Sequence, residues 1–132
     1  MERFVPYHQH LIMKCWVKNP PIETEQLNIW FVNLVDTIGM KVVAGPTSVY
    51  VSDPGNEGLT GTVTLATSHG SLHCWDQSTP SMIQFDLYSC TKFSLEEVIE
   101  CLNDFGLISY SYMMIDRNTD NFKVTSSGNV VL

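Results

Sequence analysis

Two segments of the chain carry apolar residues at the spacing of a helix with a single apolar face, and they constrain the fold most. The first covers residues 23–38 and ends before Gly39. The second begins at Ser94, forms a capping box with Glu97 and ends at Gly106. The apolar positions are Leu27, Trp30, Phe31, Leu34, Val35 and Ile38 in the first segment and Leu95, Val98, Ile99, Leu102 and Phe105 in the second. Such helices have to bury their apolar side against another layer of the protein.

That layer is predicted to be a β-sheet. Strand-like segments cover residues 10–17, 40–44 continuing towards 51, 60–67, 71–75, 82–89 and 107–115, and the polar tail from Asp116 is expected to form a loose hairpin. Short turns between the strands favour antiparallel pairing. We therefore predict the α+β class, as a two-layer sandwich with a largely antiparallel sheet and both helices on one face, in a single domain over residues 1–132. The other face is left to water or a partner.

The composition excludes several classes of protein. The 132 residues are 44% hydrophobic and 16% charged, which is typical of globular domains and not of disordered chains. A net charge of −7 leaves no basic surface for nucleic acid. No apolar stretch approaches the ~20 residues of a membrane span, and residues 1–10 lack the form of a signal peptide. We expect a soluble cytoplasmic protein.

Reactive side chains gather in two neighbouring segments, residues 67–75 (TSHGSLHCW) and 85–90 (FDLYSC). They hold two of the four cysteines, and because the chain has no C-x-x-C pair we expect reduced thiols. Ser68 and His73 are five residues apart, so on a regular strand they point to opposite faces. Their joint action would need a turn or bulge between them, and Gly70 is where we expect it.

These two segments resemble the bacterial-type S-adenosylmethionine decarboxylases. That family has Ser-His-x-x-x-His-x-Trp followed by Asp-x-aromatic-(Ser/Thr)-Cys, which this chain shows at residues 68–75 and 86–90. A Gly-Leu-Thr-Gly run at 58–61 adds to the similarity, which covers about residues 9–115. The resemblance implies a sandwich of two helices on an antiparallel sheet, in agreement with the pattern of apolar residues.

The resemblance also implies that the chain cleaves itself between Thr67 and Ser68. The Ser68 hydroxyl would attack the Thr67 carbonyl to form an ester, and β-elimination and hydrolysis would leave a pyruvoyl group at position 68. By motif position, His73 takes the Cα proton during the elimination, and Cys90 is the proton donor of the later decarboxylation. The pyruvoyl ketone would form a Schiff base with the substrate amine and accept the electrons released with carbon dioxide.

The activity implied is decarboxylation of S-adenosylmethionine, which supplies the aminopropyl donor for spermidine synthesis. Three residues correspond to substrate contacts: Tyr50 as an aromatic face for the adenine or the sulfonium, Thr60 in place of a serine, and Gln77 in place of a glutamate. The family usually has a second glutamate at the position of Thr67. A homodimer is predicted, because this family dimerises and an uncovered sheet face favours a partner.

Two other functions stay open. The changes at Thr67 and Gln77 motivate a pyruvoyl-dependent decarboxylase of an amino acid such as arginine or ornithine. The other alternative is an unprocessed homologue that binds a ligand or a partner chain without catalysis.

Metal ligation is a separate question. His69 and His73 with Cys74, or His8 with His10, have donor atoms suited to zinc. Their spacing is permissive only, and on a strand Cys74 points away from both His69 and His73. We therefore expect neither a metal nor a diffusible cofactor.

Overall fold

The computed structural model describes residues 7–118 and 120–132. Residues 1–10 were considered above for a signal peptide, and the first six of them lie outside the described part of the chain. The described elements are β1 (Gln9–Val17), α1 (Thr24–Thr37), β2 (Val42–Val51), β3 (Gly58–Leu65), β4 (Ser68–Trp75), β5 (Ser81–Ser89), α2 (Leu95–Leu102), the 3-10 helix η1 (Asn103–Phe105), β6 (Leu107–Asp116) and β7 (Lys123–Val131). Among these residues, no helix combines the length and the hydropathy needed to cross a membrane.

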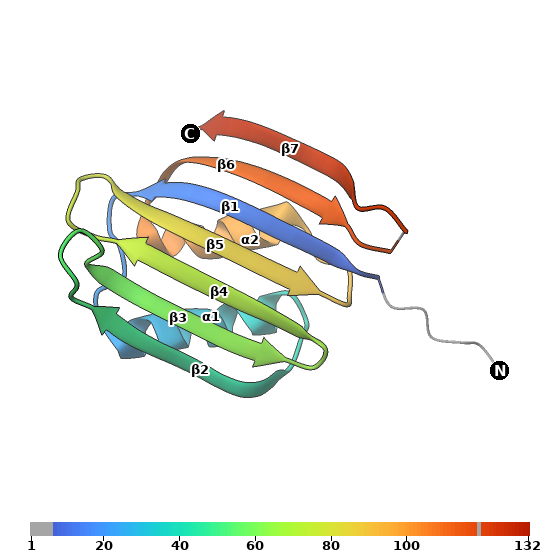
Figure 1. Ribbon diagram of the computed structural model, residues 1–132, viewed down its shortest axis with the longest axis horizontal. Coiled ribbons are helices and arrows are strands. Elements are labelled where there is room, and N and C mark those ends of the chain that lie inside the picture. Colours follow the sequence, from blue (N-terminus) through green and yellow to red (C-terminus); the bar gives the residue numbers. More distant parts are fainter. Residues whose placement is uncertain (1–6, 119) are drawn as a thin grey trace.

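The strands form one antiparallel sheet in the order β2-β3-β4-β5-β1-β6-β7. Both helices lie on the same side of this sheet, behind it in Figure 1. The predicted two-layer α+β sandwich is therefore confirmed. The first strand lies in the interior of the sheet between β5 and β6, so it brings residues that are far apart in sequence next to each other.

Side chains on the central strands alternate between a buried face and the face away from the helices, which we call the open face. In β4, every second residue from Ser68 to Cys74 is buried, and the residues between them are half-buried or exposed. β5 alternates in the same way. The buried face forms the core with the apolar sides of the helices. The open face carries His69, Ser71, His73 and Asp86 of the motif segments, whereas Ser68 and Ser89 lie on the buried face.

The helices follow the predicted pattern. α1 buries Leu27, Trp30, Phe31, Leu34 and Val35, as the helical spacing indicated. The Trp30 indole nitrogen donates a hydrogen bond to the Cys101 carbonyl at 2.8 Å, which joins α1 to α2. The predicted capping box at the start of α2 is present.

The structure differs from the sequence expectation in β4 and at the tail. β4 begins at Ser68 and keeps an unbroken register with β3 and β5, so the bulge expected at Gly70 is absent. The tail is not a loose hairpin, because residues Lys123–Val131 form a full edge strand, β7, along β6. An edge strand is held mainly by backbone hydrogen bonds, and these do not require apolar residues to alternate along the sequence.

Candidate functional site

The turn between β3 and β4 holds the first group of predicted site residues. Ala66 and Thr67 connect the two strands, and Leu65 is paired with Ser68 across the turn. Thr67 has φ of 62°, in the left-handed region that β-branched residues rarely adopt. Its hydroxyl lies 2.6 Å from the Ala66 carbonyl oxygen and 2.7 Å from the sulfur of Cys90. The turn is therefore strained at the peptide unit where cleavage is predicted.

Ser68 lies next to this turn with only 6% of its surface exposed. Its hydroxyl oxygen accepts a hydrogen bond from the Cys90 backbone N–H at 2.9 Å. This bond ties the start of β4 to the end of β5. The fold therefore brings Thr67, Ser68 and Cys90 together, although Cys90 is 22 residues from Ser68 in sequence.

The thiol of Cys90 is in a different environment from two of the other cysteines. The hydrogen bond from the Thr67 hydroxyl lowers the pKa of the Cys90 thiol, and this outweighs the opposing effect of burial. Burial raises the pKa of Cys15 and that of Cys74 to about 12. Among these three thiols, Cys90 is therefore the one that loses its proton most readily.

His73 lies away from Ser68. It projects from the open face of β4, and its Nδ1 is 3.1 Å from the hydroxyl oxygen of Thr60 on β3. Ser68 is on the buried face, and five residues of strand at about 3.3 Å each span roughly 16 Å. Because β4 has no bulge, Ser68 and His73 of one chain are not brought together.

Tyr50 and Gln77 meet at Asp76, a residue that the sequence did not single out as a site residue. The Tyr50 hydroxyl donates to Oδ1 of Asp76 at 3.0 Å, and the Gln77 amide donates to the same oxygen at 2.7 Å. Gln77 also lines a neighbouring cavity of about 260 Å³ beside Trp75. This chain therefore has a carboxylate at position 76, one residue before Gln77, which stands in place of the glutamate of the resembled family. The sequence contained this signal, since Asp76 directly precedes Gln77.

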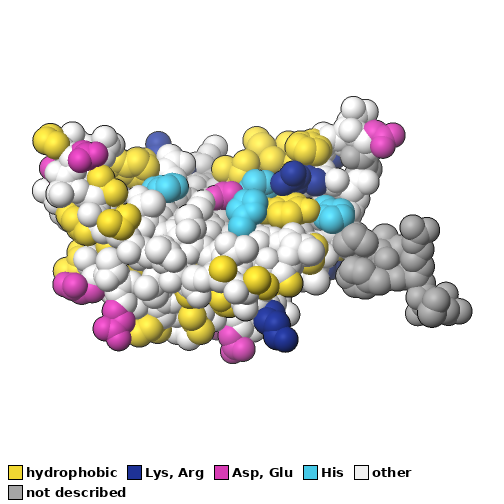
Figure 2. Space-filling view, turned by 60° about the horizontal axis from the view of Figure 1, so that its bottom comes forward, with side chains coloured by type: hydrophobic (Ala, Val, Ile, Leu, Met, Phe, Trp, Pro, Cys, Tyr) yellow, Lys and Arg dark blue, Asp and Glu magenta, His cyan; other side chains and the backbone are white. Residues whose placement is uncertain are grey.

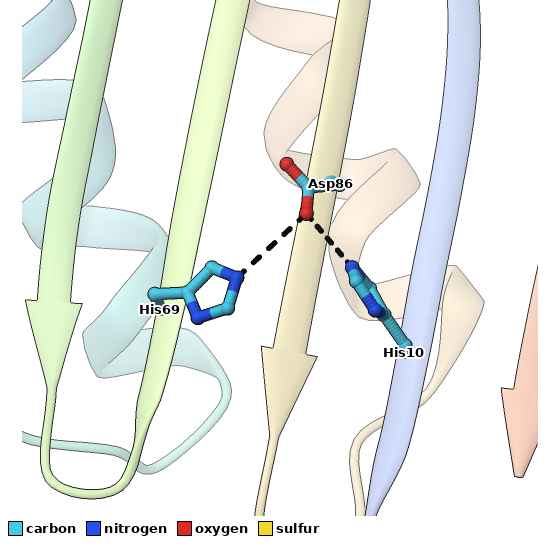
Figure 3. Close-up of side chains that lie close together, drawn as sticks. All are labelled: His10, His69 and Asp86. Atoms are coloured by element: carbon cyan, nitrogen blue, oxygen red, sulfur yellow. Dashed lines mark hydrogen bonds and ion pairs between the residues drawn. The ribbon is translucent and has the colours of Figure 1, made fainter. Parts of the chain in front are cut away.

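A third group occupies the middle of the open face. Figure 2 shows histidine side chains beside a basic and an acidic side chain on this surface. Asp86 Oδ2 lies 2.8 Å from Nε2 of His10 and 3.9 Å from Nε2 of His69. Figure 3 shows the carboxylate between the two imidazoles. The Ser71 hydroxyl donates to the other carboxylate oxygen. His10 and His69 come from the two different histidine pairs considered above for metal binding.

The electrostatics of Asp86 follow from these contacts. Burial raises the pKa of the Asp86 carboxyl, but the hydrogen bonds from His10 and Ser71 and the charges of His10 and His69 outweigh it, so the pKa lies below its ordinary value. The carboxylate is therefore held ionised between the two imidazoles. Spacing along the sequence could not reveal this group, because its members come from β1, β4 and β5.

Comparison with known proteins gives two similarities. A family model described as S-adenosylmethionine decarboxylase matches residues 9–118. A search of curated proteins found no match. Among solved structures, a phage SAM lyase in complex with S-methyl-5'-thioadenosine is similar, with a TM-score of 0.45 and 12% sequence identity, over 100% of this chain and 95% of that chain.

Proposed function

The chain belongs to the S-adenosylmethionine decarboxylase family, and from this premise we propose that it is a pyruvoyl-dependent decarboxylase of S-adenosylmethionine. Its product would be the aminopropyl donor for spermidine synthesis, and it would act in the cytoplasm on a small-molecule substrate. The observation that carries the proposal is the contact of Thr67, Ser68 and Cys90 at the β3–β4 turn.

The proposed maturation starts from the hydroxyl of Ser68. Its oxygen adds to the Thr67 carbonyl carbon, the peptide C–N bond breaks, and the hydroxyl proton passes to the freed nitrogen, which leaves an ester. Removal of the Ser68 Cα proton then expels the carboxylate of Thr67, and water converts the remaining dehydroalanine to a ketone and ammonia. The left-handed conformation of Thr67 favours the first step, because strain of about 1–3 kcal/mol is released when this backbone opens.

The residues around the turn fit the first step of the maturation. The Cys90 N–H that donates to the Ser68 hydroxyl oxygen holds that oxygen in a fixed place beside the turn where the ester would form. The ketone would supply the electron sink for loss of carbon dioxide. The Cys90 thiol, with its lowered pKa, would return a proton to the substrate carbon.

Substrate recognition is assigned to the other end of β4, roughly 26 Å along the strand from Ser68, so these residues would serve the turn of a second chain. We propose that Asp76 accepts hydrogen bonds from the ribose hydroxyls, a role for which a carboxylate is stronger than the amide of Gln77. Tyr50, which is bonded to Asp76, would present its ring to the adenine or the sulfonium. Thr60 would position His73 through their 3.1 Å contact.

We further propose that the chain acts as a homodimer. His73 cannot serve Ser68 of its own chain, because five residues of an unbroken strand hold the two residues roughly 16 Å apart. A second copy packed on the open face could bring its own His73 to the turn. The proposed base would then come from the other subunit.

Intact-mass spectrometry of the purified protein tests the cleavage. We expect two fragments, residues 1–67 and 68–132, with the second lighter by one ammonia than a fragment that begins with serine. Ser68→Ala should give only the full-length chain. A wild-type chain that stays whole after long incubation would contradict self-cleavage and support the unprocessed homologue.

Product analysis tests the substrate. Carboxyl-labelled S-adenosylmethionine, arginine and ornithine are incubated separately with the cleaved protein, and released carbon dioxide is counted. We expect release from S-adenosylmethionine alone. Release from arginine or ornithine would support the amino-acid decarboxylase. The presence of Gln77 where the family has a glutamate favours that alternative. Consumption of S-adenosylmethionine without carbon dioxide would contradict decarboxylation.

A further inference from the structure

The register of the sheet places three metal-ligating side chains around one point of the open face. His10 on β1 and His69 on β4 are both paired with Tyr88 on the strand between them. Asp86 lies two residues from Tyr88 on β5, and so on the same face. The three side chains therefore project from adjacent strands of a continuous sheet, which holds their backbones in place.

The donor atoms of these three residues all lie within 4.8 Å of one another. Two nitrogens and one oxygen, each about 2.1 Å from a tetrahedral ion, would be about 3.4 Å apart. The 2.8 Å and 3.9 Å contacts of Asp86 lie on either side of that value. Small side-chain rotations would suffice, and His69, whose side chain is 53% exposed in the single chain, has room to make them there.

We propose that His10, His69 and Asp86 form a binding site for a divalent transition-metal ion of the zinc class. Two imidazoles and one carboxylate suit zinc or cobalt, whereas magnesium prefers a shell of oxygens. Three protein ligands leave a fourth position for water or for a donor atom of a ligand. The site is distinct from the β3–β4 turn, and it does not rest on self-cleavage or on the proposed substrate.

The surrounding residues affect this site in opposite ways. The Ser71 hydroxyl binds Oδ1 of Asp86 and leaves Oδ2 directed at the imidazoles. An Arg117 nitrogen lies 3.4 Å from Nδ1 of His10. Since arginine only donates, it keeps the proton of a neutral His10 imidazole on Nε2, the atom that a metal needs. Metal binding would move that proton to Nδ1, and Arg117 would release the ring.

Arg117 has an alternative place once it releases His10. Its guanidinium already lies 4.4 Å from the centre of the Tyr88 ring and 5.2 Å from that of Phe122. These contacts persist without the hydrogen bond to His10. Arg117 therefore weakens metal binding, and replacing it should strengthen binding.

Zinc binding is measured by equilibrium dialysis of the full chain against zinc chloride, with Ser68→Ala beside the wild type so that the result does not depend on cleavage. We expect one zinc ion per chain. His69→Ala and Asp86→Asn should each weaken binding at least about tenfold. Arg117→Met should tighten it several-fold. The matched control is His73→Ala, a histidine on the same strand and the same face, which should leave the affinity unchanged.

Cobalt chloride identifies the donor atoms. We expect visible absorption of a four- or five-coordinate ion without the near-ultraviolet band of a cobalt–thiolate bond, and Cys90→Ser should leave the spectrum unchanged. The proposal is overturned if zinc does not bind saturably, if His69→Ala and Asp86→Asn bind as the wild type does, or if a thiolate band appears. Circular dichroism shows that each variant is folded, and His69→Gln replaces His69→Ala if the latter is not.

Discussion

At the scale of single residues, the conformation of Thr67 links the local sequence to the proposed chemistry. A threonine with φ of 62° is held in place by its surroundings, here by a two-residue turn and the contact of its hydroxyl with Cys90. The same hydroxyl lowers the pKa of the Cys90 thiol. One side chain thus affects both the backbone to be cleaved and the proposed proton donor.

The thiol of Cys90 should react faster than those of Cys15 and Cys74. In the uncleaved Ser68→Ala chain near pH 7.5, iodoacetamide should modify Cys90 well before Cys15 and Cys74, whose raised pKa values keep them protonated. Peptide mass spectrometry over time measures the rates. Thr67→Val, which removes only the hydroxyl, should slow the reaction of Cys90. Equal rates at Cys90 and Cys15 would show that the environment of Cys90 is wrongly described.

Asp86 should make the stability of the protein depend on acid pH. Its folded-state pKa is lowered, so its stabilising effect is present above the ordinary aspartate pKa of about 3.9 and is lost as the pH falls through the lower folded value. Asp86→Asn should therefore flatten the loss of unfolding free energy below about pH 4, as measured by urea denaturation. Ser71→Ala should have a smaller effect in the same direction. Parallel pH profiles for the wild type and Asp86→Asn would contradict this account.

At the scale of elements, the close approach of α1 to the sheet depends on a glycine in β3. A Cβ on Gly61 would lie 2.7 Å from Leu27 Cδ2, 2.8 Å from Ser48 Oγ and 3.0 Å from Phe31 Cε2. Nearby on β4, a Cβ on Gly70 would meet its closest neighbour, Val63, at 3.4 Å. The distances at Gly61 require a shift of packed side chains, whereas the distance at Gly70 is an ordinary contact.

Gly61→Ala should therefore destabilise the protein by about 1–3 kcal/mol, because the added methyl group pushes α1 away from β3. Gly70→Ala is the matched control, since it adds the same group to the same core at a position with room, and it should cost clearly less. Urea denaturation of both variants in the Ser68→Ala chain gives the comparison. Equal losses would show that α1 does not pack closely on Gly61.

At the scale of the whole molecule, the open face decides whether the predicted site residues can act together. Ile12 and Met113 are 42% and 41% exposed and line a cavity of about 420 Å³ on β1 and β6. Ser68 and His73 are separated within one chain, so the proposed elimination needs a second chain. The face that carries His73 is also the face without a second layer among the described residues.

Ile12→Glu should dissociate the proposed homodimer, because it places a charge in the middle of the open face. Sedimentation velocity measures the change. Ile29→Glu on the exposed side of α1 is the matched control, and it should leave the association unchanged. A monomeric wild type, or dissociation by Ile29→Glu alone, would contradict packing through the open face.

Mixing two variants tests whether His73 acts across the interface. His73→Ala alone and Ser68→Ala alone should stay uncleaved. Together they should yield fragments of the His73→Ala chain, because the Ser68→Ala partner supplies the missing imidazole. If the mixture stays whole while wild-type dimers cleave, His73 does not serve the other chain.

Most of the elements and the residues of the motif could be predicted from local sequence. Helical spacing in residues 23–38, the capping box at Ser94 and the strand-like runs predicted the sandwich, since these patterns depend on the period of a local structure. The motif carried Ser68 and Cys90, and the fold brings them into contact. Three features came from the three-dimensional arrangement alone: His73 lies away from Ser68, β7 completes the sheet, and His10 and His69 meet at Asp86. Neighbours across a sheet are set by strand order and register, which depend on the whole chain and not on any short segment of it.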